Sequence, residues 1–139
     1  MSAKLSSNVL RHLLAAFFAM CAQAHLTDKL TPAFALMVAD SLPDLNEKAF
    51  GFLGVTDDTF NYILMAINVF LVSVLVPRRT KRLGLLSAVG FLSLGFWGDI
   101  ATNAPILPHV ILISTAVTAL TLTLYVCIFP YHARYVAKL

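Results

Sequence analysis

The stretch that decides the fold runs from Pro108 to Phe129 and reads PHVILISTAVTALTLTLYVCIF. Its 22 residues contain no aspartate, glutamate, lysine or arginine. A helix of this length spans roughly 33 Å, which exceeds the hydrocarbon thickness of a bilayer, about 30 Å. The stretch therefore predicts a transmembrane helix with length to spare for tilt.

Three further apolar stretches have the same character and cover residues 9–26, 59–76 and 83–100. Only helices suit such spans, because open strands would leave backbone groups unpaired in lipid and the period-two alternation of a membrane barrel is missing. We expect an all-α, polytopic membrane protein. Its four transmembrane helices should form one antiparallel bundle and a single domain over residues 1–139.

The composition excludes a soluble domain, since 59% of the residues are hydrophobic and only 12% are charged. Soluble domains carry about twice that charge. The net charge of +3 does not indicate nucleic acid as a partner, because the basic run 78–82 lies between two spans, as in a short cytoplasmic turn. Cys21 and Cys127 have no CxxC spacing, and we expect neither dithiol chemistry nor a metal site. The sequence identifies no cofactor.

The positive residues also predict the orientation in the membrane. Lysine and arginine occur at both ends of the chain and in the turn 78–82, whereas the connection 27–58 is acidic and the connection 101–107 has neither. By the positive-inside rule both termini face the cytosol. We expect an endomembrane or plasma-membrane protein. The basic residues of the two ends and the turn are Lys4, Arg11, Arg78, Arg79, Lys81, Arg82, Arg134 and Lys138.

The first span has a second interpretation. Basic residues, the apolar run 13–20 and the triplet Ala22-Gln23-Ala24 are also typical of a secretory signal with an A-x-A cleavage site. Cleavage there would leave three helices with the same orientations. The charges do not decide between the two interpretations.

The connection 27–58 has 32 residues and is too long and too apolar for a featureless loop. Apolar residues at helical spacing follow Thr31-Pro32, and a second apolar piece covers residues 49–55. We expect one or two short interfacial helices there, which form either a lid over the bundle or a simple membrane anchor.

Polar residues gather at the outer ends of all four spans. His25, Asp28, Asp99 and His109 are the candidate catalytic residues, because a carboxylate beside a histidine holds one tautomer and raises the basicity of the imidazole. His25, Asp28 and Lys29 share one face if the first helix continues. For each residue the alternative is an ordinary interfacial anchor or cap.

Four more residues are candidates for substrate binding: Asn61, Asn68, Trp97 and Asn103. Asn68 is deeper in its span, and a hydrogen bond to a neighbouring helix is the favoured explanation. The third span also carries small residues at spacings of three and four, which indicates close helix packing rather than a ligand groove. This seam consists of Gly84, Ala88, Phe91, Gly95 and Gly98.

The order of these features resembles a known family. A first helix that leads into HLTDKLTP (25–32), an amphipathic outer segment, a second helix that ends in LVPRRTKRLG (75–84) and two further helices resemble the DoxX-like small membrane proteins. The resemblance implies a four-helix bundle with the first span retained. Similar proteins include subunits of quinone-linked oxidation, receptor-assembly chaperones and members of fungal biosynthetic gene clusters.

We therefore expect an integral membrane protein that handles a small lipophilic molecule or quinone at the outer-leaflet end of the bundle. It would be a membrane enzyme or accessory protein of a redox or secondary-metabolite pathway. The alternative is an assembly factor or chaperone that docks a larger membrane protein. Under either hypothesis the lipid bilayer is a partner.

Overall fold

The computed structural model describes the backbone of residues 3–136 and the side chains of residues 3–127. The Lys138 counted above in the basic tail lies outside these residues, as does the side chain of Arg134. The described chain is entirely helical, with no strand in it. Its elements are α1 (Ala3–Leu26), α2 (Pro32–Phe50), the 3₁₀ turn η1 (Gly51–Leu53), α3 (Asp57–Leu75), α4 (Lys81–Thr102) and α5 (Leu107–Val136).

Four of these helices are long and apolar enough to cross a membrane: α1, α3, α4 and residues 107–127 of α5. The chain is thus a multi-pass, all-α membrane protein, which confirms the predicted fold class. All four helices begin before the predicted spans: polar residues extend α1, α3 and α4 beyond the apolar run, and α5 begins one residue earlier, at Leu107. The predicted ends of the first and second spans lie within one residue of Leu26 and Leu75.

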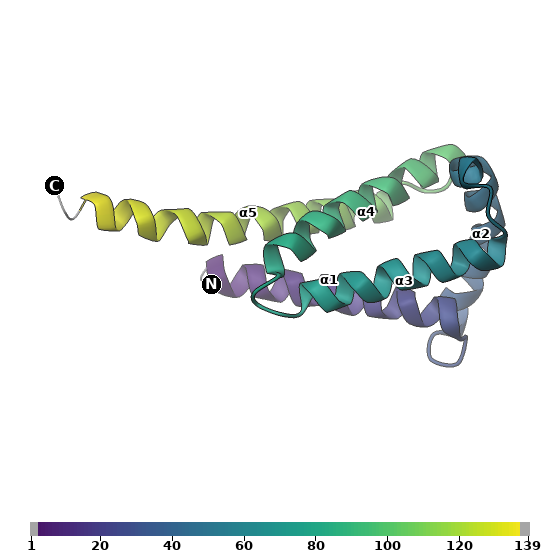
Figure 1. The fold of residues 1–139 in the computed structure, drawn as a ribbon, viewed down its shortest axis with the longest axis horizontal. Coiled ribbons are helices and arrows are strands. Elements are labelled where there is room, and N and C mark those ends of the chain that lie inside the picture. Colours follow the sequence, from purple (N-terminus) through teal and green to yellow (C-terminus); the bar gives the residue numbers. More distant parts are fainter. Residues whose placement is uncertain (1–2, 137–139) are drawn as a thin grey trace.

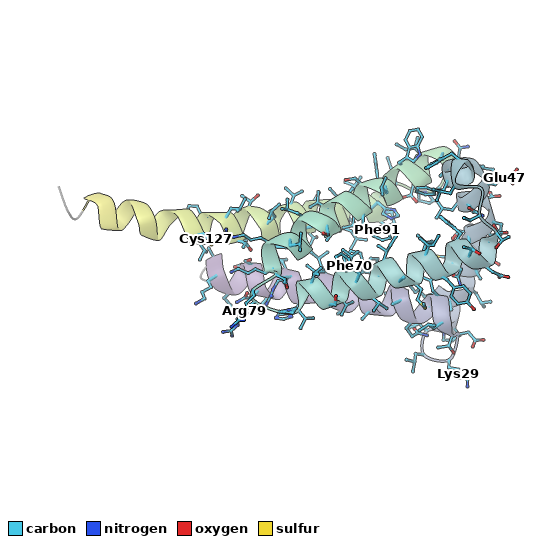
Figure 2. All side chains as sticks on the ribbon, in the orientation of Figure 1. Lys29, Glu47, Phe70, Arg79, Phe91 and Cys127 are labelled. Carbon is cyan, nitrogen blue, oxygen red and sulfur yellow. The ribbon has the colours of Figure 1, made fainter. Side chains whose placement is uncertain are left out.

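Figure 1 shows how the helices are arranged. α1 packs along α3 and α5, α4 packs along α5, and α2 closes one end of the bundle. We call this end the α2 end; the α3–α4 turn lies at the opposite end, together with the start of α1. In Figure 2 Lys29 and Glu47 mark the α2 end and Arg79 the opposite one.

The core runs along the α1 face that meets α3 and α5. Leu14 and Phe18 of α1 are almost fully buried there, so removing the first span would expose the core of the bundle. The other core members are Ala15, Leu71, Leu75, Leu85, Ala88, Leu92, Ala116 and Ala119.

The connection 27–58, for which one or two short helices were expected, forms one long helix followed by a single 3₁₀ turn. α2 has 19 residues and begins at Pro32, whose missing N–H costs nothing in a first turn. The second apolar piece, 49–55, is not one separate helix but is shared between α2 and η1. Ala49 and Phe50 belong to α2, and η1 ends at Gly54, which adopts a φ of +63° that favours glycine.

The glycines of the α4 seam lie against three different helices, so the predicted packing role is confirmed. A Cβ at Gly84 would lie 2.7 Å from the carbonyl oxygen of Val74 in α3. One at Gly98 would lie 2.5 Å from Cδ1 of Leu45 in α2. A Cβ at Gly95 would overlap the imidazole of His109 in α5.

Arg11 joins α1 to the end of α3. Its side chain is only 2% exposed, and Nη1 donates to the carbonyl oxygens of Leu75, Val76 and Pro77 at 2.9, 3.1 and 3.3 Å. The last carbonyls of a helix have no partner within it, and the guanidinium supplies their hydrogen bonds. The sequence marked Arg11 only as a charge of the amino end, whereas the structure gives it a role inside the bundle.

Candidate functional site

A cavity of about 480 Å³ lies at the α2 end, where the end of α1, the first half of α2 and the start of α3 meet. This volume is in the range of small-molecule sites. One wall is apolar and comes largely from α2: Ala35, Leu36, Val38, Ala39, Leu42 and Pro43. The facing wall is polar and contains His25, Asp28, Asp57, Asp58 and Asn61.

The start of α3 is fixed by its own cap. The hydroxyl of Thr56 accepts a hydrogen bond from the backbone N–H of Thr59, and Asp57 and Asp58 occupy the first turn, where negative charge favours a helix. Buried Asn46 of α2 donates to the Asp57 carboxylate at 2.8 Å and to the Val55 carbonyl at 3.0 Å. These bonds hold α2 against α3 and shape the cavity.

His25 and Asn61 make two hydrogen bonds that define the state of the imidazole. Nδ2 of Asn61 donates to the backbone carbonyl of His25 at 3.1 Å, so the other amide atom, Oδ1, is an acceptor. Oδ1 lies 2.6 Å from Nδ1 of His25, which must therefore carry the hydrogen. Nε2 of a neutral His25 is left as the acceptor. The sequence predicted both residues as site residues but not that they pair.

Asp28 reaches the same cavity from the bend after α1. α1 ends at Leu26, so the predicted helical face of His25, Asp28 and Lys29 does not form. The bend is held by Gln23, whose Nε2 donates to the Thr27 carbonyl and whose Oε1 accepts from the Thr31 hydroxyl, each at 2.6 Å.

Asp99 and His109 form a second pair between α4 and α5. The Asp99 carboxylate lies 2.5 Å from Nδ1 of His109. The ring edge that carries Nε2 packs against Gly95. Neither residue is among those that line the cavity. The expected convergence of four catalytic candidates is therefore wrong for the described structure, which separates them into two groups.

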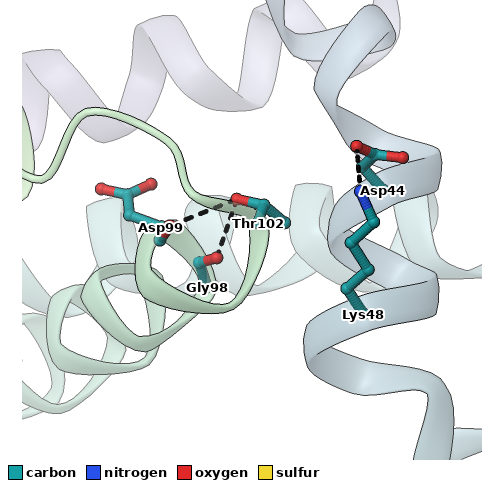
Figure 3. A network of polar contacts seen from close by, with 5 residues as sticks. All are labelled: Asp44, Lys48, Gly98, Asp99 and Thr102. Carbon is teal, nitrogen blue, oxygen red and sulfur yellow. Dashed lines mark hydrogen bonds and ion pairs between the residues drawn. The ribbon is translucent and has the colours of Figure 1, made fainter.

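Figure 3 shows the surroundings of Asp99. The Thr102 hydroxyl donates to the carbonyls of Gly98 and Asp99 at 2.9 and 3.4 Å, and the Asp99 carboxylate points away from Lys48 of α2. Lys48 bonds to Asp44 at 2.8 Å, and this hydrogen bond raises the pKa of its ammonium. Lys48 therefore pairs with Asp44 and not with Asp99.

Near Asp99, Phe50 of α2 lies between α4 and α3 and makes apolar contacts with both helices. A Cβ at Gly98 would be 3.9 Å from the ring of Phe50, and the rings of Phe50 and Phe60 are 5.5 Å apart. Phe60 is buried and directly precedes Asn61. The second half of α2 therefore covers α4 with apolar side chains, while its first half covers the polar cavity.

The other predicted binding residues have structural positions. Asn68 is 3% exposed and donates to the Leu64 carbonyl of its own helix at 2.8 Å, so the expected bond to a neighbouring helix is wrong. Its Oδ1 is buried without a partner. Trp97 is 55% exposed on the surface of α4. Asn103, with φ of +56°, ends α4. None of the three lines the cavity.

Sequence reasoning missed the acidic start of α3 and the α2 wall. The pair Asp57-Asp58 directly before the second apolar run was the available signal, and Pro43 within the long connection was another. Among the side chains that the structure describes, no group of three histidine, cysteine or acidic residues lies close enough together to hold a metal ion.

Two curated proteins resemble the chain over almost their whole length. "Cyclic ether formation enzyme xenC" of Xenoacremonium sinensis is 35% identical over 120 residues, which cover 86% of this chain and 98% of the relative. "Cyclic ether formation enzyme gkaZ" of Penicillium citrinum is 35% identical over 123 residues, which cover 86% and 96%. No protein-family model matches the chain, and no solved structure matches it significantly. Its identity to these relatives shows that the chain belongs to the family of the cyclic ether formation enzymes.

Proposed function

We propose that this chain is a membrane-embedded biosynthetic enzyme that closes a cyclic ether in a lipophilic substrate, with the reacting hydroxyl bound beside His25. The similarity to two cyclic ether formation enzymes along nearly their full length carries the reaction class. The cavity at the α2 end supplies the place, because it combines an apolar wall with an oriented imidazole.

Closure of a cyclic ether forms one C–O bond and breaks one O–H bond together with one bond at the attacked carbon, either a C–O bond of an epoxide or the π bond of a conjugated alkene. The hydroxyl oxygen attacks an electrophilic carbon of the same molecule, and its proton passes to Nε2 of His25. When that carbon belongs to an epoxide or a conjugated double bond, the closure is an isomerisation. The proton then returns to the opened epoxide oxygen or to the far carbon of the alkene, and no oxidant or reductant is consumed.

His25 suits the role of proton acceptor better than His109. Asn61 holds its Nδ1–H, so Nε2 presents a lone pair, and the residue lines the cavity. Asp28, Asp57 and Asp58 line the same cavity. The Nε2 edge of His109, in contrast, packs against Gly95.

The mouth of the cavity supports a lipophilic substrate. Leu26 and Leu36 line it and are themselves 64% and 62% exposed. The cavity lies at the end of α1 and the start of α3, two helices that can span a membrane, and thus at the depth at which a bilayer passes from hydrocarbon to headgroups. A molecule dissolved in the bilayer can therefore reach the polar wall while its hydrocarbon part stays against α2.

The test replaces xenC by this chain in Xenoacremonium sinensis and measures the cyclic ether product by mass spectrometry. Wild-type protein should restore the product. His25→Gln should lower its rate of formation by about 10²- to 10⁴-fold, as expected for a lost general base. His109→Gln is the matched control, with the membrane level of each variant checked by immunoblot.

Three outcomes would contradict parts of the proposal. If wild-type protein is present in the membrane and forms no product, the chain does not share the relative's reaction. If His25→Gln retains activity, the cavity is not the site of proton transfer. If only His109→Gln abolishes the product, the Asp99–His109 pair is the base.

A further inference from the structure

Pro43 interrupts the hydrogen bonds of α2 at the wall of the cavity. It lies inside the helix, eleven positions after Pro32. Proline has no N–H, so the carbonyl of Ala39, four residues earlier, cannot form its usual helical bond. Both Ala39 and Pro43 are exposed, and both line the cavity. The otherwise apolar wall therefore contains one backbone acceptor that the helix does not use.

The polar wall also consists mainly of acceptors. Asp28, Asp57 and Asp58 contribute carboxylates, and a neutral His25 contributes Nε2. Asn61 uses its oxygen and one of its two amide N–H groups on His25. No lysine or arginine is among the described residues that line the cavity. A ligand with hydroxyl or N–H groups would meet acceptors on both walls of the cavity.

We propose that the cavity selects an uncharged amphiphile whose polar edge carries at least two donors, hydroxyl or amide N–H, and that one of them bonds to the Ala39 carbonyl. This inference rests on the proposed function and specifies its substrate class. One donor would be the hydroxyl that His25 deprotonates, and the second would bond across the cavity to α2. The hydrocarbon part would pack on Leu36, Val38 and Leu42.

The same arrangement rejects anions. A carboxylate or phosphate would enter a volume with three acidic side chains and no lining lysine or arginine to compensate it.

Binding can be measured without knowledge of the natural substrate. The full chain is placed in phosphatidylcholine nanodiscs and titrated with 1,2-dodecanediol or with sodium dodecanoate, which has the same chain length. The signal is the ¹³Cε1 resonance of His25, assigned by its loss in His25→Gln. The diol should shift this resonance to saturation, and dodecanoate at equal concentration should not.

Pro43→Ala tests the backbone acceptor directly, since it restores an N–H at position 43. The helix then uses the Ala39 carbonyl, so the Kd for the diol should rise about three- to tenfold, the equivalent of one neutral hydrogen bond. The melting temperature should rise at the same time, because proline is the least favourable residue inside a helix. A merely structural defect would weaken binding and lower stability together. Pro32→Ala, at the first helical position, is the matched control and should leave the Kd unchanged.

Two results would overturn the inference: an unchanged Kd in Pro43→Ala, or dodecanoate binding as tightly as the diol. A fall in the melting temperature of Pro43→Ala would also contradict it. These results are independent of turnover. If Pro43→Ala leaves binding unchanged while His25→Gln abolishes product, the proposed reaction stands and only the substrate class is wrong.

Discussion

The contact between Gly95 and His109 predicts the outcome of a single added methyl group. In Gly95→Ala the new Cβ would lie 2.8 Å from Cδ2 of His109 and overlap its Nε2. The backbone of α4 has no need to move, because the imidazole can rotate away. Rotation, however, breaks the 2.5 Å bond between His109 and Asp99 that joins α5 to α4.

The size of the effect follows from two opposing terms. A hydrogen bond to a charged group contributes about 1.5–3 kcal/mol, and replacing glycine by alanine inside a helix returns up to about 1 kcal/mol. Gly95→Ala should therefore destabilise the protein by about 0.5–2 kcal/mol. Gly90 is the matched control, because a Cβ there meets nothing within 4 Å. Gly90→Ala should stabilise by up to about 1 kcal/mol.

Unfolding in mixed micelles of a mild detergent and sodium dodecyl sulfate, followed by circular dichroism, measures both variants. The same two substitutions in a His109→Ala background complete a double-mutant cycle. Once the imidazole is absent, Gly95→Ala should be as favourable as Gly90→Ala. The reasoning is refuted if the two alanines behave alike in the wild-type background, or if the penalty at position 95 persists without His109.

Two other predictions concern the end of the bundle opposite α2 and the orientation of the chain. Arg11→Met should destabilise the protein by about 3–5 kcal/mol in the same assay, because it removes a buried donor that satisfies three carbonyls. Arg79 is exposed, and Arg79→Met should change the free energy of unfolding by no more than about 0.5 kcal/mol. Equal effects would show that the guanidinium of Arg11 does not support α3. For orientation, Cys21 and Cys127 are replaced by serine and one cysteine is introduced at position 29 or 79. With both termini cytosolic, a membrane-impermeant maleimide applied from outside, or from the lumen, should label position 29 at once and position 79 only after permeabilisation, and the reverse order would invert the topology.

The sequence was sufficient for the fold because the membrane imposes a length and a composition on each span. Four apolar stretches of adequate length predicted four helices, and all four are present. Their ends were less predictable, since hydropathy detects only the residues immersed in lipid and not the polar turns that extend a helix. The resemblance to the DoxX-like proteins stays a prediction, because no family model matches the chain.

The sequence predicted at which end of the bundle the candidate site residues lie, but not which of them face one another. An antiparallel topology alone places His25, Asp99 and His109 at one end. Which of them face one another depends on the rotation of each helix and on where α2 lies, and neither follows from a period of 3.6 residues. His25 therefore meets Asn61, while Asp99 meets His109.

Two informative residues were hidden by their ordinary roles. Arg11 counts as a cytosolic charge in a topology argument, and only the fold shows that it reaches the last carbonyls of α3. Pro43 interrupts an otherwise helical stretch and so hides the length of α2. Pro43 lines the cavity only because α2 continues through it, and a proline in the sequence argues against such a continuous helix.

The hydrogen bonds at the two ends of the α1–α3 pair have a mechanical consequence. Arg11 bonds to Leu75 at one end and His25 to Asn61 at the other, and the two bonds are fourteen residues apart on both helices. This spacing corresponds to about 21 Å, nearly four full turns, so both anchors lie on the same face of each helix. α1 can neither slide along α3 nor roll against it without breaking both anchors. The pair is a rigid frame that carries the imidazole, and α2 is fastened to that frame by the segments 27–31 and 51–56 and by the hydrogen bonds of Asn46 to Val55 and Asp57.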